Sequence, residues 1–277
     1  MINLIRKIQI HPVFWGILGI GALTGLFKEL LMLFFIVFIH ELGHSYMAYR
    51  FKWRIKRIVL LPFGGMAETE EYGNRPVKEE ILVIIFGPIQ HIWLIGGSFL
   101  LLQTPFWSQA DHDIFLFHNI VILLFNLLPI LPLDGGKLVF SVYSYFSSFH
   151  KAHRRSYFTS ACLLFLVSAF SLFYLSFHLN LIVVLIFLWI HHYLEWKQRH
   201  YMFLRFLLER RRIGPYGTEK CITVSPTWTV SDAMKLVNRQ RYHYFTFGKN
   251  GVVLEEPKVL EAFFDEEKRI LPLAKLI

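Results

Sequence analysis

Six apolar segments, each long enough or nearly long enough to cross a lipid bilayer, restrict what this chain can fold into. They cover residues 11–27, 30–51, 80–102, 115–133, 156–177 and 179–196. A helix of about 20 apolar residues crosses a hydrocarbon core about 30 Å thick. The composition agrees, since 55% of the 277 residues are hydrophobic and only 18% are charged. The sequence therefore predicts a polytopic α-helical membrane protein with six transmembrane helices.

The basic residues orient these segments. One set of connections holds nearly all of them, and the opposite set holds only Lys28. The first set contains Arg6, Lys7, the basic residues of 50–57, Arg75, Lys78, Lys137, Lys151, Arg154, Arg155 and the whole region after Trp196. Because loops rich in Lys and Arg stay in the cytoplasm, both termini are expected there. The net charge of +9 has the same explanation, and no nucleic-acid recognition motif accompanies it.

The chain changes character after Trp196. Residues 197–213 form a basic, amphipathic stretch that predicts a linker helix near the membrane surface. Residues 214–277 combine mixed charge, turn signals and alternating segments, which is typical of a small soluble α/β domain. We therefore expect a membrane domain over 1–196, the linker, and a cytoplasmic domain over 214–277. Two cysteines, Cys162 and Cys221, support neither a disulfide framework nor a zinc finger.

The second apolar segment contains the motif HELGH. His40 and His44 are four residues apart, so a helix places both imidazoles on one face, where they can hold one metal ion. Glu41 projects beside that position and can take a proton from an attacking water, as in the HExxH motif of zinc proteases. The alternative is that the two histidines only make hydrogen bonds within the helix bundle. Ionisable groups at bilayer depth are costly, which favours the zinc site.

A catalytic zinc site needs a third protein ligand and one open position. The candidates are Asp134, His91, His118, Glu68, Glu70 and Glu71. Depth favours Asp134, because it follows His118 by sixteen residues, as His44 follows Lys28. At about 1.5 Å per residue, both lie about 24 Å from the outer side. Pro129 and Pro132 interrupt the fourth segment just before Asp134 and predict unwound backbone there.

The pair HELGH and NLLPILPLDGG (126–136) resembles the site-2 protease family of intramembrane zinc proteases, over a core of about residues 30–145. The resemblance implies one zinc ion per chain, held by His40, His44 and Asp134, with Glu41 as general base. It also implies that Asn126 positions the substrate. The family often has a Gly-Pro-x-x-Asn element in the intervening span. Here that element reads GPIQH (87–91), so the family asparagine is replaced.

Two further segments carry functional predictions. Residues 55–67 are apolar with a Gly-Gly turn, and they predict a β-hairpin whose edge pairs with an unwound substrate; the alternative is an ordinary interfacial loop. Residues 222–264 resemble a single CBS domain, with Asp232 at a helix start. CBS modules usually work in pairs and commonly bind adenine nucleotides. That resemblance implies a homo-oligomer and a possible site for ATP or another adenine nucleotide.

A site-2 core, six spans and one C-terminal CBS domain together resemble the sporulation proteases of endospore-forming bacteria. This resemblance implies a membrane-associated sigma-factor precursor as substrate and inhibitory membrane proteins as partners. It also implies a place in the mother-cell-derived membrane around the forespore. The rival function is a metal transporter or nucleotide-gated channel that uses the same histidines as a transit site. That rival leaves the general-base position of Glu41 unexplained.

Overall fold

The computed structural model describes residues 7–10, 12–61, 64–174, 179–247, 251 and 253–276. The chain divides into two compact units. The N-terminal unit comprises Met1–Glu70, Lys78–Leu128 and Leu133–Gly135. The C-terminal unit comprises Glu71–Val77, Pro129–Pro132 and Gly136–Ile277. Each unit is described by itself.

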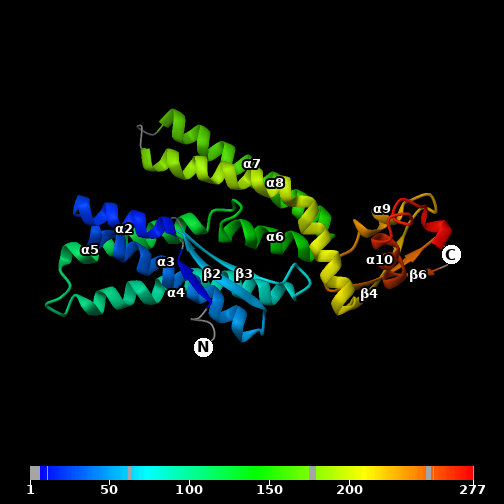
Figure 1. Cartoon of the computed structure of the whole chain (residues 1–277), viewed down its shortest axis with the longest axis horizontal. Helices are drawn as coiled ribbons and strands as arrows, with labels where there is room; N and C mark the ends of the chain where they lie inside the picture. The colour runs from blue at the N-terminus through cyan, green and yellow to red at the C-terminus, as the bar shows by residue number, and fades with distance from the viewer. Residues whose placement is uncertain are drawn as a thin grey trace. The chain divides into compact units, whose positions relative to one another are not determined.

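Four helices and a small sheet build the N-terminal unit (Figure 1). The helices are α2 (Pro12–Thr24), α3 (Phe27–Arg50), α4 (Val77–Leu101) and α5 (Gln109–Asn126). Gly25, at a φ of 78°, forms the tight turn between α2 and α3, where a side chain would be strained. Helix α3 packs on α5 through Met32, Ile36 and Phe115. This packing places the HELGH motif inside the unit.

The ends of α3 and α5 are also joined by polar contacts. Ser108 caps α5, because its hydroxyl accepts a hydrogen bond from the Asp111 N–H while the Asp111 carboxylate accepts one from the Ser108 N–H. Lys28 lies 2.5 Å from the same carboxylate. The start of α3 and the start of α5 therefore lie at one level.

The predicted hairpin at 55–67 is present in the described residues. Strands β2 (Ile55–Leu61) and β3 (Gly64–Thr69) pair antiparallel, with Val59 opposite Met66. Strand β1 (Ile8–Ile10) pairs parallel with β2, so the order is β1-β2-β3. β2 is thus the central strand, and β3 forms one outer edge. Residues 62 and 63 of the predicted turn lie outside the described residues.

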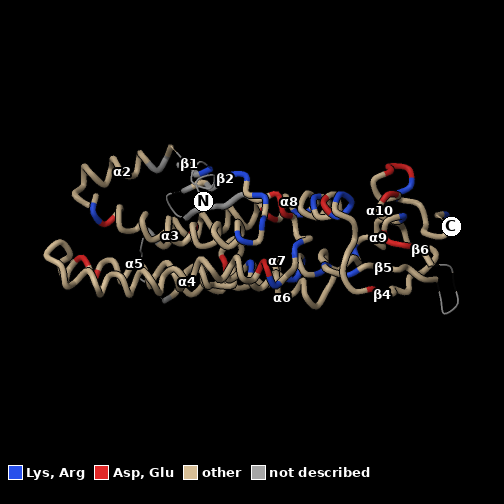
Figure 2. The backbone as a smooth tube through the Cα atoms, turned by 90° about the horizontal axis from the view of Figure 1, so that it is seen from below, with Lys and Arg blue, Asp and Glu red and all other residues tan. Residues whose placement is uncertain are grey.

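The prediction of a helical membrane protein is confirmed. Among the described residues, three helices are long and apolar enough to cross a bilayer. They are Phe27–Arg50, Val77–Leu101 and Phe149–Phe173. The segment Trp15–Thr24 is a shorter apolar helix. Figure 2 shows few charged residues along most of α3, α4 and α5. The count of six spans stays a prediction.

Several element boundaries differ from those expected. Helix α5 ends at Asn126, so the predicted span 115–133 leaves the helix earlier than expected, and residues 127–133 are irregular as the two prolines predicted. A separate helix, α6 (Asp134–Phe146), then begins. The predicted sixth span and the linker form one continuous helix, α8 (Leu179–Ile213). The three-domain division of the chain stays a prediction.

Helices α7 (Phe149–Tyr174) and α8 pack together in the C-terminal unit (Figure 1). A small mixed domain follows α8. Its strands are β4 (Thr218–Thr223), β5 (Arg241–Thr246) and β6 (Val253–Glu255), in the order β4-β5-β6. β4 and β5 are parallel, and β5 and β6 are antiparallel. Its helices are α9 (Val230–Met234), α10 (Glu256–Phe264) and a 3-10 turn, η1 (Leu273–Leu276).

The end of α8 belongs to the core of this small domain. Phe206 and Leu207 are fully buried in one cluster with Met234, Phe245 and Leu260. Next to them, Arg210 of α8 donates hydrogen bonds to the buried carboxylate of Glu256 in α10. The α/β character predicted for residues 214–277 is confirmed. The domain is fixed to α8 by both apolar packing and a buried ion pair.

Candidate metal centre

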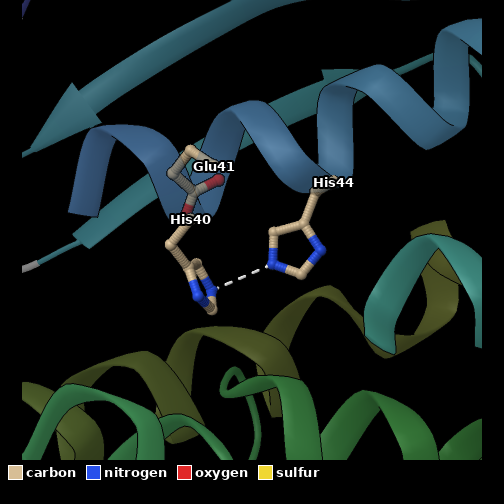
Figure 3. Close-up of side chains that lie close together, drawn as sticks. All are labelled: His40, Glu41 and His44. Atoms are coloured by element: carbon tan, nitrogen blue, oxygen red, sulfur yellow. Dashed lines mark hydrogen bonds between the residues drawn. The ribbon is translucent and has the colours of Figure 1, made fainter. Parts of the chain in front are cut away.

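Helix α3 presents the HELGH motif inside the N-terminal unit. His40 and His44 project from one side of α3, one turn apart, while Glu41 leaves the helix in another direction (Figure 3). One ligand atom from each of the three residues lies within 4.8 Å of the others. All three side chains are buried. The i and i+4 spacing therefore produces the convergence that the sequence predicted.

Asp134 completes a compact group of three atoms with the two histidines. The Nε2 atom of His40 lies 3.0 Å from Nε2 of His44 and 3.0 Å from Oδ2 of Asp134. The distance from Nε2 of His44 to the same carboxylate oxygen is also 3.0 Å. The three atoms thus form a nearly equilateral triangle, although Asp134 lies 94 residues after His40.

This triangle fits a zinc ion. Zinc lies about 2.0–2.1 Å from imidazole nitrogen and about the same from carboxylate oxygen. Three donor atoms spaced 3.0 Å apart can all lie at that distance from one ion, so the triangle would accommodate zinc. Two imidazoles and one carboxylate are a donor set that zinc favours, and one coordination position stays open for water or substrate.

Hydrogen bonds fix the orientation of both imidazoles. Nδ1 of His44 lies 2.8 Å from the carbonyl oxygen of Val83, so this nitrogen carries the proton and donates it. A neutral His44 ring then presents its Nε2 lone pair toward His40 and Asp134, where a metal ion would be held. Such a contact at the second nitrogen is usual for a histidine that binds metal.

Two successive hydrogen bonds connect His40 to α4 and then to α5. Its Nδ1 lies 3.0 Å from Nε2 of His91 in α4, and Nδ1 of His91 lies 2.5 Å from Oδ1 of Asn119 in α5. If His40 donates to His91 and His91 donates to Asn119, Nε2 of His40 also faces the metal position as an acceptor. His91 and Asn119 are fully buried. Three helices therefore position this one ring.

Glycines allow α3 and α4 to approach each other closely. A Cβ atom added at Gly87 would overlap the imidazole of His44. A Cβ at Gly43 would lie 2.6 Å from the Phe86 carbonyl oxygen and 2.6 Å from Cγ of Gln90. The GPIQH element, which departs from the family pattern, thus supplies the space beside His44 and the histidine behind His40.

Asp134 is positioned by the end of the irregular segment. It is the first residue of α6, where the helix dipole favours a carboxylate. A Cβ at the following Gly135 would overlap the carbonyl oxygens of Leu127 and Leu128, so only glycine lets the backbone return this closely to the end of α5. The segment therefore turns the aspartate back toward the histidine helix.

The other predicted residues lie elsewhere. Among the third-ligand candidates whose side chains the structure describes, Asp134 contacts both histidines and His91 contacts His40 from the side opposite Asp134. His118 is part-buried in α5 beside Phe117, and Glu70 lies 3.9 Å from Arg54. Glu71, another of the candidates, is likewise engaged by a basic side chain, Arg75, at 2.9 Å. The side chain of Glu68 lies outside the described part of the chain.

Two asparagines of α5 differ in whether the sequence predicted a role for them: it did so for Asn126 and not for Asn119. Asn126 is the part-buried last residue of α5, and its predicted contact with substrate is untested. Asn119 was not predicted. The signal that could have found it is its amide within an apolar helix, because polar groups at that depth usually have a partner.

Comparison with known proteins gives consistent matches. The sequence model of "Peptidase family M50" matches residues 28–109 and 113–169. The chain is 43% identical over its full length to "Stage IV sporulation protein FB" of Bacillus subtilis, covering 98% of that protein. It is 25% identical over 88% of its length to "Zinc metalloprotease MJ0392" of Methanocaldococcus jannaschii, of which 68% is covered.

A solved structure extends the similarity from sequence to fold. The structure described as "Site-2 Protease from Methanocaldococcus jannaschii" superimposes with a TM-score of 0.54 and 26% identity. The match covers 68% of this chain and 89% of that one.

Proposed function

The chain belongs to peptidase family M50, and on this basis we propose that it cleaves a membrane-associated protein near the cytoplasmic side of the membrane, at a zinc centre held by His40, His44 and Asp134. It is an intramembrane zinc metalloprotease of the site-2 type. The observation that carries the ligand assignment is the triangle of two imidazole nitrogens and one carboxylate oxygen, each 3.0 Å from the others. Its place in a helix of bilayer length supports cleavage within the membrane.

The proposed mechanism assigns one task to each side chain. When bound, zinc supplies a Lewis acid that polarises the scissile carbonyl and favours deprotonation of the attacking water. Glu41 accepts that proton on its carboxylate and passes it to the leaving amine. His40, His44 and Asp134 would hold the ion through two imidazole nitrogens and one carboxylate oxygen. Buried surroundings strengthen these electrostatic interactions, because little water screens them.

Substrate positioning involves Asn126 and the edge of the sheet. A helical substrate hides its peptide groups in hydrogen bonds, so it must be extended before water can attack. Strand β3 offers an outer backbone edge to which an extended segment can add as a further strand. Asn126, at the end of α5, supplies an amide that can hold the substrate backbone or the developing oxyanion.

The proposed topology has six spans with both termini in the cytoplasm. Helices α2, α5 and the first part of α8 would complete the set begun by the three apolar helices. The near absence of basic residues from the alternate connections supports this orientation.

The proposed substrate is a sigma-factor precursor processed during sporulation. Full-length similarity to a protein named for stage IV of sporulation supports this role. Inhibitory membrane proteins are expected partners, and the membrane around the forespore is the expected location. The proposal for residues 214–277 is a CBS domain that binds an adenine nucleotide and pairs between chains. Family membership decides against the metal transporter or nucleotide-gated channel.

The test uses Glu41→Gln in the full chain, co-expressed with a membrane-anchored precursor. Loss of a general base lowers rates by about 10²–10⁴-fold, so cleavage should fall below detection while bound zinc stays at the wild-type level. Glu29→Gln, in the first turn of the same helix, is the matched control and should cleave normally. Wild-type cleavage by Glu41→Gln would remove the assignment of the base.

A further inference from the structure

A cavity of about 610 Å³ in the C-terminal unit lies outside the metal centre. It is lined from two directions, by the first turns of α7 and by the region of α9. Basic side chains dominate the lining: His150, Lys151, Arg154, Arg155 and Lys235. Trp228, Leu236 and Asp232 complete it.

Within the part of the chain that the structure describes, the positive charge of this cavity is not balanced. Asp232 is the single acid among the lining residues, and it already lies 2.9 Å from Lys235. Hydrogen bonds from Lys235 and Thr229 hold the pKa of Asp232 below its usual range, so it stays ionised and engaged. Among the described residues, no carboxylate forms an ion pair with Lys151, Arg154 or Arg155. Like charges around one cavity favour an anion inside it.

Ring contacts between α7 and α8 show at which level the cavity lies. Tyr157 of α7 stacks on His192 of α8, with ring centroids 4.1 Å apart. Two turns earlier, His150 contacts Phe203 at 5.4 Å. The residues of α7 that line the cavity are therefore level with the part of α8 between these two contacts.

Both helices change from basic to apolar at this level. Helix α7 has no charged residue from Ser156 onward, and α8 is largely apolar up to Ile190 and basic from Lys197, with Glu195 the one charged residue in its first eighteen. Trp189, Tyr193 and Trp196 lie on the apolar side of the change, and the guanidinium of Arg199 lies 4.6 Å from the Trp196 ring. An aromatic belt beside basic residues is typical of the headgroup region of a bilayer.

We propose that this cavity binds the phosphate group of an anionic ligand, supplied either by a phospholipid headgroup or by a soluble phosphate ester. Arg and Lys together recognise phosphate by charge-assisted hydrogen bonds. Basic residues directly cytoplasmic of a transmembrane helix attract anionic lipids. The level of the cavity beside the aromatic belt favours the lipid as the source. The site is separate from the zinc centre and does not depend on the peptidase reaction.

The test is native mass spectrometry of the full chain in detergent, with phosphatidylglycerol or phosphatidylcholine added. The pocket variant is Arg154→Gln/Arg155→Gln, in which two exposed side chains lose their charge. The matched control is Arg212→Gln/Lys258→Gln, which removes the same charge from exposed positions away from the cavity. Wild type and control should retain phosphatidylglycerol, and the pocket variant should retain about tenfold less. Phosphatidylcholine should be retained by none of the three.

A second arm separates the two sources of phosphate. Excess inorganic phosphate or ATP is added to the lipid-loaded wild type. Lipid that stays bound identifies a headgroup site, and lipid that is displaced identifies a site shared with soluble phosphate esters; both results support phosphate binding here. The proposal is overturned if the pocket variant retains phosphatidylglycerol and binds phosphate as the wild type does. It is also overturned if the control variant loses the lipid to the same extent.

Discussion

His44 owes its position to the residue that faces it from α4. Gly87 has no side chain, and the imidazole occupies the space that a Cβ would fill. The ring cannot move away freely, because its Nδ1 donates to the Val83 carbonyl 2.8 Å away. At the scale of single residues, the position of His44 therefore depends on a glycine and a backbone carbonyl of α4.

Replacement of Gly87 by alanine should therefore displace His44. We expect Gly87→Ala to lose most bound zinc and cleavage, measured by metal analysis of purified protein and by processing of a co-expressed precursor. Gly97→Ala in the same helix is the control, because a Cβ there meets nothing within 4 Å. Wild-type zinc content in Gly87→Ala would show that the ring is not held as described.

The chain from His40 through His91 to Asn119 should tune zinc affinity. Loss of such a partner typically lowers metal affinity about 10–100-fold. Asn119→Leu removes the acceptor for His91 and should show that loss in a competition titration with a chelator. Asn119→Asp keeps an oxygen at the same place and should bind zinc more tightly than Asn119→Leu. Equal affinity in wild type and Asn119→Leu would contradict a positioning role.

The residues of the candidate site differ in how far the sequence could predict them. His40, Glu41 and His44 lie within one helical turn, so their spacing alone gives their relation. Asp134 needed a family resemblance and a rough estimate of depth. The contacts of Gly87 and Asn119 could not be predicted, because they depend on how α3, α4 and α5 pack, and helix packing is not encoded in local spacing.

At the scale of elements, the sheet has one strand more than the hairpin that was expected. Because β1 covers the far side of β2, an added strand cannot pair with β2 and must use an outer edge. β3 is an outer edge and packs on the zinc helix α3. This relation makes β3 the edge most suited to hold a substrate beside the metal.

Proline in β3 should therefore reduce cleavage without loss of zinc. Proline lacks the N–H that a β-ladder needs. Neighbouring residues of a strand point their N–H groups to opposite edges, so one of the variants Met66→Pro and Ala67→Pro removes a donor from the outer edge of β3. The other removes a donor from the pairing of β3 with β2. Both should process the precursor more slowly, while zinc content is unchanged. Gln109→Pro, at the first position of α5, is the control that tolerates proline. Full processing by both β3 variants would exclude a role for this edge.

Element boundaries were harder to predict than element types. Hydropathy placed the fourth segment at 115–133, but the prolines end α5 at Asn126 and allow α6 to begin at Asp134. Hydropathy also stopped the sixth segment at residue 196, whereas α8 continues to Ile213. A helix continues wherever its backbone bonds are made, whether its side chains face lipid or water, so a change of polarity is not a helix end.

At the scale of the whole molecule, the small C-terminal domain depends on α8 for part of its core. Arg210 and Glu256 are almost fully buried, and Nδ1 of His243 lies 2.7 Å from the same carboxylate. Removal of one partner from a buried ion pair typically costs about 3–5 kcal/mol. Arg210→Leu should therefore lower hydrogen-exchange protection of β5, and exposed Arg212→Leu should not. Equal protection in the two variants would contradict the account.

The same cluster predicts how stability depends on pH. Burial raises the pKa of Glu256, but hydrogen bonds from His243 and Arg210 outweigh it and leave that pKa below its usual value of 4.5. Burial lowers the pKa of His243, which accepts the Asn238 N–H at Nε2 and so is held neutral. For both groups the unfolded chain binds more protons than the folded chain, so the free energy of unfolding decreases as pH falls. The loss begins below about 6.5, where His243 of the unfolded chain is protonated, and continues below about 4.5, where Glu256 of the unfolded chain is protonated. Protection of β5 that rises on acidification would contradict this sign.

We propose a zinc ion held by two imidazoles of α3 and by the carboxylate that opens α6. X-ray absorption at the zinc edge, on the purified full-length chain, tests it most directly. We predict one zinc per chain with two histidine nitrogens and carboxylate oxygen at about 2.0–2.1 Å, and loss of the carboxylate signal in Asp134→Ala. A folded, active protein without stoichiometric zinc, or a shell with fewer than two histidines, would contradict it.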